Sequence, residues 1–365
     1  MIVATVMPGF LTASLAPRIR GDFAFGDSAL GIAVALFYVV SAVGSTPAGR
    51  LIDRVGAGRG TAMAAVATGA CCLGVAALAQ SAASLTALLV LGGAGNALGG
   101  PTVSKLLRRE IAVERQGLAF GVQQSGAPLG ALLAGLALPA VAIPLGWRWA
   151  FVGTVLLTLV AATGAPRGGA PAAATAGAPH PPGLGSVHAL GLAAVLASAA
   201  GVGFVSFLVT YSVDSGMSEA TAGLLLGGVS LMATLSRIGV GVLADRAGQE
   251  PLRPVAAMLA ASVAGYLLLI AGEPAVIATG ALLAGALGWA WPGGLTLAVV
   301  QRSPGAPAWA VGVLMTGLFA GAVAGPLLVG LLAEHDLFTG AWATCAAFVA
   351  LSAVTLVATR RWEGR

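Results

Sequence analysis

The chain has 365 residues, of which 58% are hydrophobic and 8% are charged, and its mean hydropathy is +0.95. Soluble domains carry about a quarter charged residues, so this composition excludes a soluble globular protein and indicates a polytopic membrane protein. The net charge of +5 does not indicate nucleic-acid binding, because the 18 basic residues are scattered singly between apolar runs. The three cysteines lie in apolar segments, and we expect no disulfide framework, no metal site and no cofactor.

Apolar stretches long enough to cross a bilayer occur in two sets of six. A transmembrane helix needs about 20 mostly apolar residues, and charged clusters and Gly/Pro breaks separate such stretches here. The sequence therefore predicts an all-α membrane protein with twelve transmembrane helices. The predicted spans lie near residues 1–16, 28–50, 60–80, 84–106, 117–139 and 146–164, and then near 188–211, 219–243, 253–271, 274–298, 308–332 and 339–359.

A segment rich in proline and glycine separates the two sets. Residues 165–187 contain five prolines, five glycines and one charged residue, a composition typical of a flexible linker. We therefore expect an N-terminal bundle over 1–164 and a C-terminal bundle over 188–365. The first span is short, and we interpret it as a clipped helix, because MIVATVMPG lacks the basic residues of a signal peptide.

The basic residues predict the orientation. With twelve spans both termini lie on one side of the membrane, and 15 of the 18 basic residues fall on that side, leaving only Arg18, Arg20 and Arg148 opposite. Lysine and arginine accumulate in cytoplasmic loops. The sequence thus predicts a multi-pass plasma-membrane protein with both termini in the cytoplasm, the lipid bilayer around it, and a monomeric state.

Two stretches of the chain repeat. GRLIDRVG at 49–56 and GVLADRAG at 241–248 share charged residues at an offset of 192, and four glycines of the fifth helix of each half match at an offset of 195. Such matches indicate two pseudo-symmetric six-helix bundles. The first repeat pairs Gly49, Asp53, Arg54 and Gly56 with Gly241, Asp245, Arg246 and Gly248; the second pairs Gly117, Gly126, Gly130 and Gly135 with Gly312, Gly321, Gly325 and Gly330.

The first stretch, with Arg59 beyond it, resembles the loop motif between helices two and three of the major facilitator superfamily. The 241–248 copy looks like its second-half counterpart, and Glu114-Arg115 and GWRW at 146–149 resemble the same family. The resemblance implies a latch at the cytoplasmic face that closes the inner gate in one state and opens during transport. A carboxylate of Asp53 or Asp245 there can stabilise the positive N-terminus of a helix from the other half.

Glycines and prolines in the fifth helix of each half have two interpretations. Gly312, Gly321, Gly325 and Pro326 resemble the antiporter motif of the family, although that motif is described for the first half, where this chain has Gly126-Ala127-Pro128. Alternatively, glycines allow close helix packing and prolines a bend. The packing and kink residues are Gly126, Pro128, Gly130, Gly321, Gly325 and Pro326.

Candidate cavity residues cluster where helices look interrupted, because broken helices near the midplane form transporter sites. GGAGNALGGP around Asn96 and GWAWPGGL around Trp289 and Trp291 are two such places. Tryptophans at i and i+2 cannot share a helix face, so we expect at most one to face the cavity. Three more polar candidates lie inside spans: Tyr38, Gln123 and Gln124.

Arg237 lies inside an apolar run, two helical turns before Asp245. An arginine within a membrane span is a functional-site hypothesis by default. It also lies close enough to the cytoplasm for its side chain to extend to the membrane surface, which is the arrangement we expect. The 13 carboxylates lie in loops or at helix ends, so proton coupling would depend on residues such as Asp22 and Asp27.

These features favour a secondary active transporter that moves a small organic solute or drug-like molecule by alternating access, with protons as a candidate coupling ion. Drug or metabolite efflux and small-solute uptake are the competing roles, and a carrier for the uptake of small organic anions is an alternative. A membrane enzyme needs a nucleophile with its base or a metal cluster inside the bilayer, and the three histidines lie in the linker, at a helix start and in an external loop. We therefore expect no enzyme activity. A receptor or scaffold that does not transport is the remaining alternative.

Overall fold

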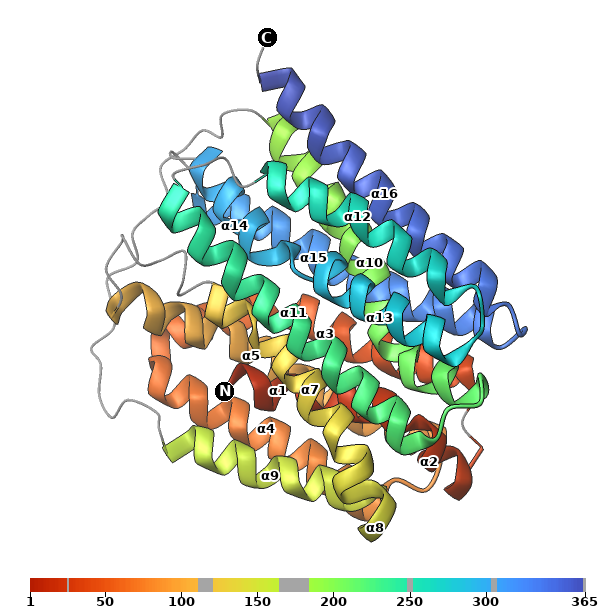
Figure 1. Cartoon of the computed structure of the whole chain (residues 1–365). Coiled ribbons are helices and arrows are strands. Elements are labelled where there is room, and N and C mark those ends of the chain that lie inside the picture. The colour runs from red at the N-terminus through yellow and green to blue at the C-terminus, as the bar shows by residue number, and fades with distance from the viewer. Residues whose placement is uncertain (25, 111–120, 164–183, 248–251, 303–306, 364–365) are drawn as a thin grey trace.

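A computed structural model of the chain describes residues 1–24, 26–110, 121–163, 184–247, 252–302 and 307–363. Within these ranges the chain is helical, with no strand (Figure 1). Ten helical segments are long and apolar enough to span a membrane, the bent pair α1–α2 adds one, and α9 is a shorter apolar helix of 17 residues. The predicted all-helical membrane fold is confirmed.

The first half begins with a bent helix. α1 (Ile2–Ser14) and α2 (Ala16–Asp22) meet at 65°, where Pro17 in the first turn of α2 lacks the N–H that would continue α1. The first span therefore extends beyond its predicted end at residue 16. The other helices of this half are α3 (Asp27–Val55), α4 (Ala57–Leu78), α5 (Ala82–Glu110), a helical turn at 121–124, α7 (Gly126–Ala137), the π-helix η2 (Leu138–Ala142), α8 (Ile143–Leu145) and α9 (Trp147–Thr163).

The second half contains longer uninterrupted helices and one break. α10 is mostly buried, and α13 stops at Gly288, three residues before α14 begins. The helices are α10 (Leu184–Asp214), α11 (Glu219–Ala247), α12 (Leu252–Leu269), α13 (Pro274–Gly288), α14 (Trp291–Arg302), α15 (Pro307–Ala333) and α16 (Phe338–Glu363).

One of the two interruptions expected from the sequence is wrong. α5 is continuous through Asn96, because glycine keeps its backbone N–H and the single proline at 101 does not end the helix. The predicted break around Trp289 and Trp291 does occur, at Ala290. The site therefore has a broken helix in the second half but not at the matching place in the first.

Helices of each half pack mainly on one another, and a few pairs join the halves (Figure 1). α4 packs on α5 and α9, and α3 packs on α5; in the second half, α10 packs on α15 and α16, and α12 on α13 and α16. The halves meet where α3 contacts α15, α7 contacts α11, and α1 contacts α10. The bundle division stays a prediction, since residues 164–183 lie outside the described residues; residues 184–187, expected in the linker, already belong to α10.

The halves approach most closely at the end of the molecule that carries Asp27, here called the Asp27 end. A Cβ atom on Gly31 of α3 would lie 2.5 Å from the Pro326 carbonyl oxygen and 3.4 Å from the Gly330 Cα of α15. A Cβ on Gly135 of α7 would lie 2.6 Å from the Gly223 carbonyl oxygen of α11. Only glycine permits backbones this close, so the contacts are specific to these positions.

Toward the opposite end, which carries Gly56, Gly49 and Gly312 make no close contact of this kind. No described atom outside the local helix lies within 4 Å of a Cβ built on Gly49 of α3 or on Gly312 of α15. On the other side of the interface the halves stay in contact, since a Cβ on Gly121 would lie 4.0 Å from the Gly241 Cα of α11. The two halves therefore contact each other between the 121–124 turn and α11 toward the Gly56 end.

Polar contacts also join the halves at the Asp27 end. Arg18 of α2 forms an ion pair with Glu219 at the start of α11. The backbone N–H of Ser28, in the first turn of α3, donates to the Glu334 carboxylate at 2.9 Å, and an anion at a helix N-terminus is stabilised by the helix dipole. Two acidic side chains of the second half therefore contact the first half: Glu219 contacts α2, and Glu334 contacts the start of α3.

Candidate functional site

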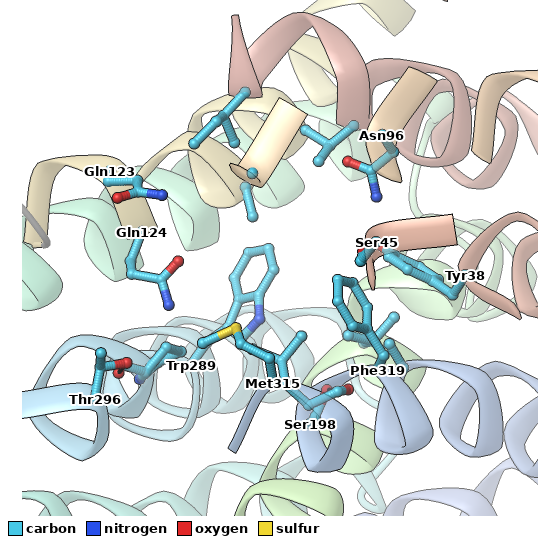
Figure 2. Close-up of a pocket in the computed structure, with 18 of the residues that line it drawn as sticks. Tyr38, Ser45, Asn96, Gln123, Gln124, Ser198, Trp289, Thr296, Met315 and Phe319 are labelled. Atoms are coloured by element: carbon cyan, nitrogen blue, oxygen red, sulfur yellow. Dashed lines mark hydrogen bonds between the residues drawn. The ribbon is translucent and has the colours of Figure 1, made fainter. Parts of the chain in front are cut away.

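A cavity of about 340 Å³ lies between the two halves (Figure 2). It is lined by residues of α1, α3, α5, α7, α10, α11, α14 and α15, by the turn at 121–124 and by Trp289, which follows α13. Its volume lies at the low end of the range for small-molecule sites, roughly 300–1,000 Å³. The wall is mostly apolar, with a small number of polar groups. All seven residues predicted as cavity candidates line it: Tyr38, Asn96, Gln123, Gln124, Arg237, Trp289 and Trp291.

Figure 2 shows the Trp289 ring between Gln124 on one side and Ser45 and Tyr38 on the other. That these residues bind substrate stays a prediction, but the structure brings them to one place from helices far apart in sequence. Residues of both halves line the cavity, so neither half alone forms it.

Arg237 does not extend to the membrane surface, and that expectation is wrong. Its side chain is buried, with the residue only 3% exposed. Nε donates to the Trp289 carbonyl oxygen at 2.8 Å, and an Nη donates to the Gln124 carbonyl oxygen. The guanidinium carbon also lies 5.2 Å from the Trp289 ring centroid, within the range of a cation–π interaction.

The reason lies in two backbone carbonyls that have lost their helical partners. In an α-helix the carbonyl of residue 124 would accept from the N–H of residue 128, but Pro128 has no N–H. Trp289 follows the last residue of α13, where carbonyls have no intrahelical donor. A buried guanidinium needs hydrogen-bond acceptors, and these two carbonyls provide them without a carboxylate.

Both tryptophans line the cavity, whereas at most one was expected. The expectation assumed a continuous helix over residues 274–298. Because α13 ends at Gly288 and α14 begins at Trp291, the two side chains no longer follow one helical period. The Trp289 ring packs edge-on against Phe10 of α1, with centroids 6.1 Å apart and an interplanar angle of 82°.

On the first-half wall, two polar candidates are held by neighbours. The Asn96 amide nitrogen donates to the Ser41 hydroxyl at 3.0 Å, and that hydroxyl donates to the Phe37 carbonyl at 2.8 Å. Tyr38 is 7% exposed and lies edge-on to Phe37. Their orientation is therefore set by α3 and α5 before any ligand binds.

Sequence reasoning missed the apolar part of the wall. From the sequence alone, apolar side chains of a cavity wall cannot be distinguished from core side chains, because an apolar span carries no signal for the face that lines a cavity. Ser198 and Thr296 were missed because their hydroxyls bond to their own or neighbouring helices, as is usual in spans. The missed apolar residues of the wall include Phe10, Met315, Leu318 and Phe319.

The predicted latch residues lie at the Gly56 end. Gly49 and Asp53 are in α3, and Gly56, at φ +87°, joins α3 to α4 in a conformation that favours glycine. The arginines of this copy, Arg54 and Arg59, are exposed. In the second copy the backbones of Gly241, Asp245 and Arg246 belong to α11, whereas Gly248 and the helix start near Gly117 lie outside the described residues. The helix start expected opposite Asp53, near Ala308, is described, since α15 begins at Pro307.

The predicted packing and kink residues make close contacts. A Cβ on Gly126 would lie 2.5 Å from the Ile2 side chain, and one on Gly130 would lie 2.5 Å from the Val6 side chain, both on α1. In α15 the corresponding distances are 2.2 Å from the Val195 carbonyl oxygen for Gly321 and 2.1 Å from the Ala199 carbonyl oxygen for Gly325. Pro326, within α15, faces Gly31 as described above.

Sequence comparison now assigns the family. The family model described as Major Facilitator Superfamily matches residues 1–252, more than half of the chain. The chain belongs to the major facilitator superfamily. The resemblance predicted from the 49–56 stretch is therefore confirmed, and the chain belongs to a family of membrane transporters.

Curated relatives and solved structures agree with this membership. An uncharacterized MFS-type transporter of Mycobacterium tuberculosis (strain CDC 1551 / Oshkosh) is 29% identical over 335 residues, 86% of this chain and 72% of the relative. A hexuronate transporter of Bacillus subtilis (strain 168) is 26% identical over 145 residues, 40% of this chain and 34% of that one.

Two solved structures share the fold. A bacterial homologue of the human lysosomal transporter Spinster, in an inward-facing and occupied conformation, superposes with a TM-score of 0.72 at 16% identity, covering 99% of this chain and 94% of its own. The human organic anion transporter MFSD10 (TETRAN) superposes with a TM-score of 0.70 at 16% identity, covering 97% of each chain. At this identity the likeness shows the fold alone.

Proposed function

We propose that the chain is a secondary transporter of the plasma membrane that moves a small organic solute by alternating access, with the cavity around Arg237 as its binding site. The observation that carries this proposal is the position of the cavity between two halves that are tightly packed at the Asp27 end and lack such close contacts at Gly49 and Gly312 toward the Gly56 end. A site enclosed by two bundles can be exposed to each side in turn by rocking one against the other.

The orientation follows from the distribution of basic residues. Because 15 of the 18 basic residues fall on the side that includes the Gly56 end, that end is cytoplasmic in this proposal, and both termini are cytoplasmic. The structure then corresponds to a state closed to the outside.

The latch residues fit this state. In the proposal, Asp53 and Asp245 hold helices of the opposite half when the Gly56 end closes, and release them when it opens. The empty surroundings of Gly49 and the exposure of Arg54 and Arg59 are consistent with a released first copy. We keep the monomeric state and proton coupling as expectations; Asp22 and Asp27 form ion pairs with Arg148 and Arg20 at the Asp27 end and do not line the cavity.

The proposal can be tested without knowing the substrate. In a background lacking Cys71, Cys72 and Cys345, all buried, we would introduce Met315→Cys on the cavity wall. We expect a membrane-impermeant thiol reagent to label it from both faces of oriented vesicles. Adding Arg18→Cys and Glu219→Cys and joining them with a reducible bifunctional thiol reagent should fix the Asp27 end closed. Labelling should then occur only from the Gly56 face and recover after reduction.

A matched control separates gating from damage by the cross-link. Arg20 and Asp27 form an ion pair within the first half, so joining cysteines at these two positions should leave labelling from both faces intact. Labelling of Met315→Cys from one face only, before any cross-link, would contradict alternating access and favour a receptor or scaffold.

Replacing Glu334 should favour opening at the Asp27 end. In Glu334→Ala the backbone N–H of Ser28, at the N-terminus of α3, loses its acceptor from the second half. Such a contact typically stabilises a helix by about 0.5–2 kcal/mol. We expect a several-fold increase in the rate at which Met315→Cys is labelled from the Asp27 face. Glu273→Ala, an exposed glutamate before α13 with no side-chain capping bond, is the control and should leave the rate unchanged. An equal increase in both variants would contradict the role of Glu334.

A further inference from the structure

We infer that the cavity binds a monoanionic organic solute with an apolar or aromatic body, and that the guanidinium of Arg237 binds its carboxylate. The inference rests on the proposed function only in naming what the transporter carries. Three features of the cavity wall support it: its charge, its hydrogen-bond donors and its apolar surface.

The charge of the wall is unbalanced. Among the described residues that line the cavity, Arg237 alone carries a charge. Within the described part of the chain no carboxylate lies within 4.0 Å of its guanidinium. A buried charge is costly unless it is paired. Carbonyl dipoles from Gln124 and Trp289 solvate the guanidinium only in part, so the wall lacks one negative charge that a ligand can supply.

The wall also has donors without acceptors. A guanidinium has five N–H groups, and the two hydrogen bonds of Arg237 to carbonyl oxygens occupy two of them. An unpaired buried donor is unfavourable, and a carboxylate can accept from several donors at once. The set of donors therefore suits an anion and disfavours a cation.

The rest of the wall suits an apolar body. Phe10, Leu318, Met315 and Phe319 line the cavity with the ring of Trp289, and no described carboxylate lies among them. Aromatic and thioether side chains contact aromatic rings favourably. A small, strongly hydrated solute would leave this surface without partners, whereas an aromatic acid would cover it.

Binding of an anion would also change the contact between the halves. The Gln124 carbonyl belongs to the first half and Arg237 to the second, so their hydrogen bond crosses the interface. A carboxylate binds a guanidinium more strongly than a neutral carbonyl does, because both partners are charged. The ligand would therefore compete with the Gln124 carbonyl and loosen this cross-interface bond, which links occupancy to movement of the halves.

The test uses three probes with one ring system and different charges. We would measure the unfolding temperature and binding affinity of the purified full-length protein with indole-3-acetate, indole-3-acetamide and tryptamine, since a ligand that binds the folded form raises its stability. We expect indole-3-acetate to stabilise the protein and tryptamine not to. The neutral amide should bind roughly 10- to 100-fold more weakly, the difference typical of losing a charged hydrogen bond.

Variants locate the binding to Arg237. Arg237→Gln should abolish the preference for the acid over the amide, and Arg237→Lys should retain the preference at lower affinity, because lysine keeps the charge but not the planar donor pair. Arg253→Gln, which removes an exposed arginine at the start of α12, is the control and should bind like the wild type. If Arg237→Gln does not fold, the wild-type probe series and Arg237→Lys still decide the question.

Three outcomes would overturn the inference: equal stabilisation by acid and amide, stabilisation by tryptamine, or an unchanged preference for the acid in Arg237→Gln. Stronger binding of glucuronate than of indole-3-acetate would overturn the apolar body while keeping the anion. These results are independent of the thiol labelling above. If Met315→Cys is labelled from both faces but the protein does not bind indole-3-acetate, only the proposed substrate class is contradicted. If the protein binds indole-3-acetate but is labelled from one face only, only the proposed transport function is contradicted.

Discussion

Replacing Gly325 by alanine is expected to lower the unfolding temperature of the protein strongly. The added Cβ would lie 2.1 Å from the Ala199 carbonyl oxygen and 2.9 Å from its carbon, both backbone atoms of α10. Backbone cannot rotate away as a long side chain can, so α10 and α15 must move apart. Overpacking of this kind costs typically about 1–3 kcal/mol, and α10 is the most buried of the spans found in the described residues.

The same helix provides the control. Gly312 of α15 is exposed, and no described atom outside the local helix lies within 4 Å of its Cβ position. Gly312→Ala should leave the unfolding temperature unchanged or raise it, since alanine is favoured over glycine in a helix by roughly 0.5–1 kcal/mol. Thermal unfolding of both variants in the same detergent tests this prediction. A Gly325→Ala protein as stable as Gly312→Ala would contradict the packing described for α10 and α15.

Arg237 and Pro128 are expected to be energetically coupled. Arg237→Met removes two charged hydrogen bonds and leaves the Gln124 and Trp289 carbonyls without donors. Each lost bond costs about 1.5–3 kcal/mol, offset in part by removal of a desolvated charge. In Pro128→Ala the new backbone N–H at residue 128 can donate to the Gln124 carbonyl. We therefore expect Arg237→Met to destabilise this variant less than the wild type, by on the order of 1 kcal/mol.

A double-mutant cycle measures the coupling, because two residues that share a partner deviate from additivity. Pro326→Ala is the matched control. It also removes a proline from the fifth helix of one half, but Arg237 donates its two hydrogen bonds to carbonyls of residues 124 and 289 and not to the carbonyl that loses its N–H partner to Pro326. Arg237→Met and Pro326→Ala should be additive. Additivity of Arg237→Met with Pro128→Ala would show that the missing N–H of Pro128 does not create the acceptor for Arg237.

The sequence predicts the fold because transmembrane helices are specified by properties that a single chain displays. Span length, apolar content and the repeated Asp-Arg stretch need no knowledge of contacts. The site was predictable in part for a related reason: an amide, a tryptophan pair or an arginine inside an apolar run is expensive, and its position alone marks it. Asn96, Gln124 and Arg237 all line the cavity.

What the sequence did not predict depends on contacts between helices. The direction of the Arg237 side chain was wrong because the two carbonyls that accept its hydrogen bonds come from other segments, at residues 124 and 289. The shared cavity surface of Trp289 and Trp291 depended on the exact residue at which α13 ends. Phe10 and Met315 could not be separated from ordinary core residues, because only the packed structure says which apolar faces remain uncovered.

The acceptors of Arg237 are main-chain oxygens, and this affects how the site can change over evolution. A substitution at residue 124 or 289 alters the side chain on the cavity wall but retains the carbonyl that solvates the guanidinium. Relatives could thus vary the side chains at these positions, and with them the shape of the accepted solute, while keeping the two carbonyls that accept hydrogen bonds from Arg237. An aligned family would then show an invariant arginine with no co-varying acid, and selectivity would diversify around a fixed cation.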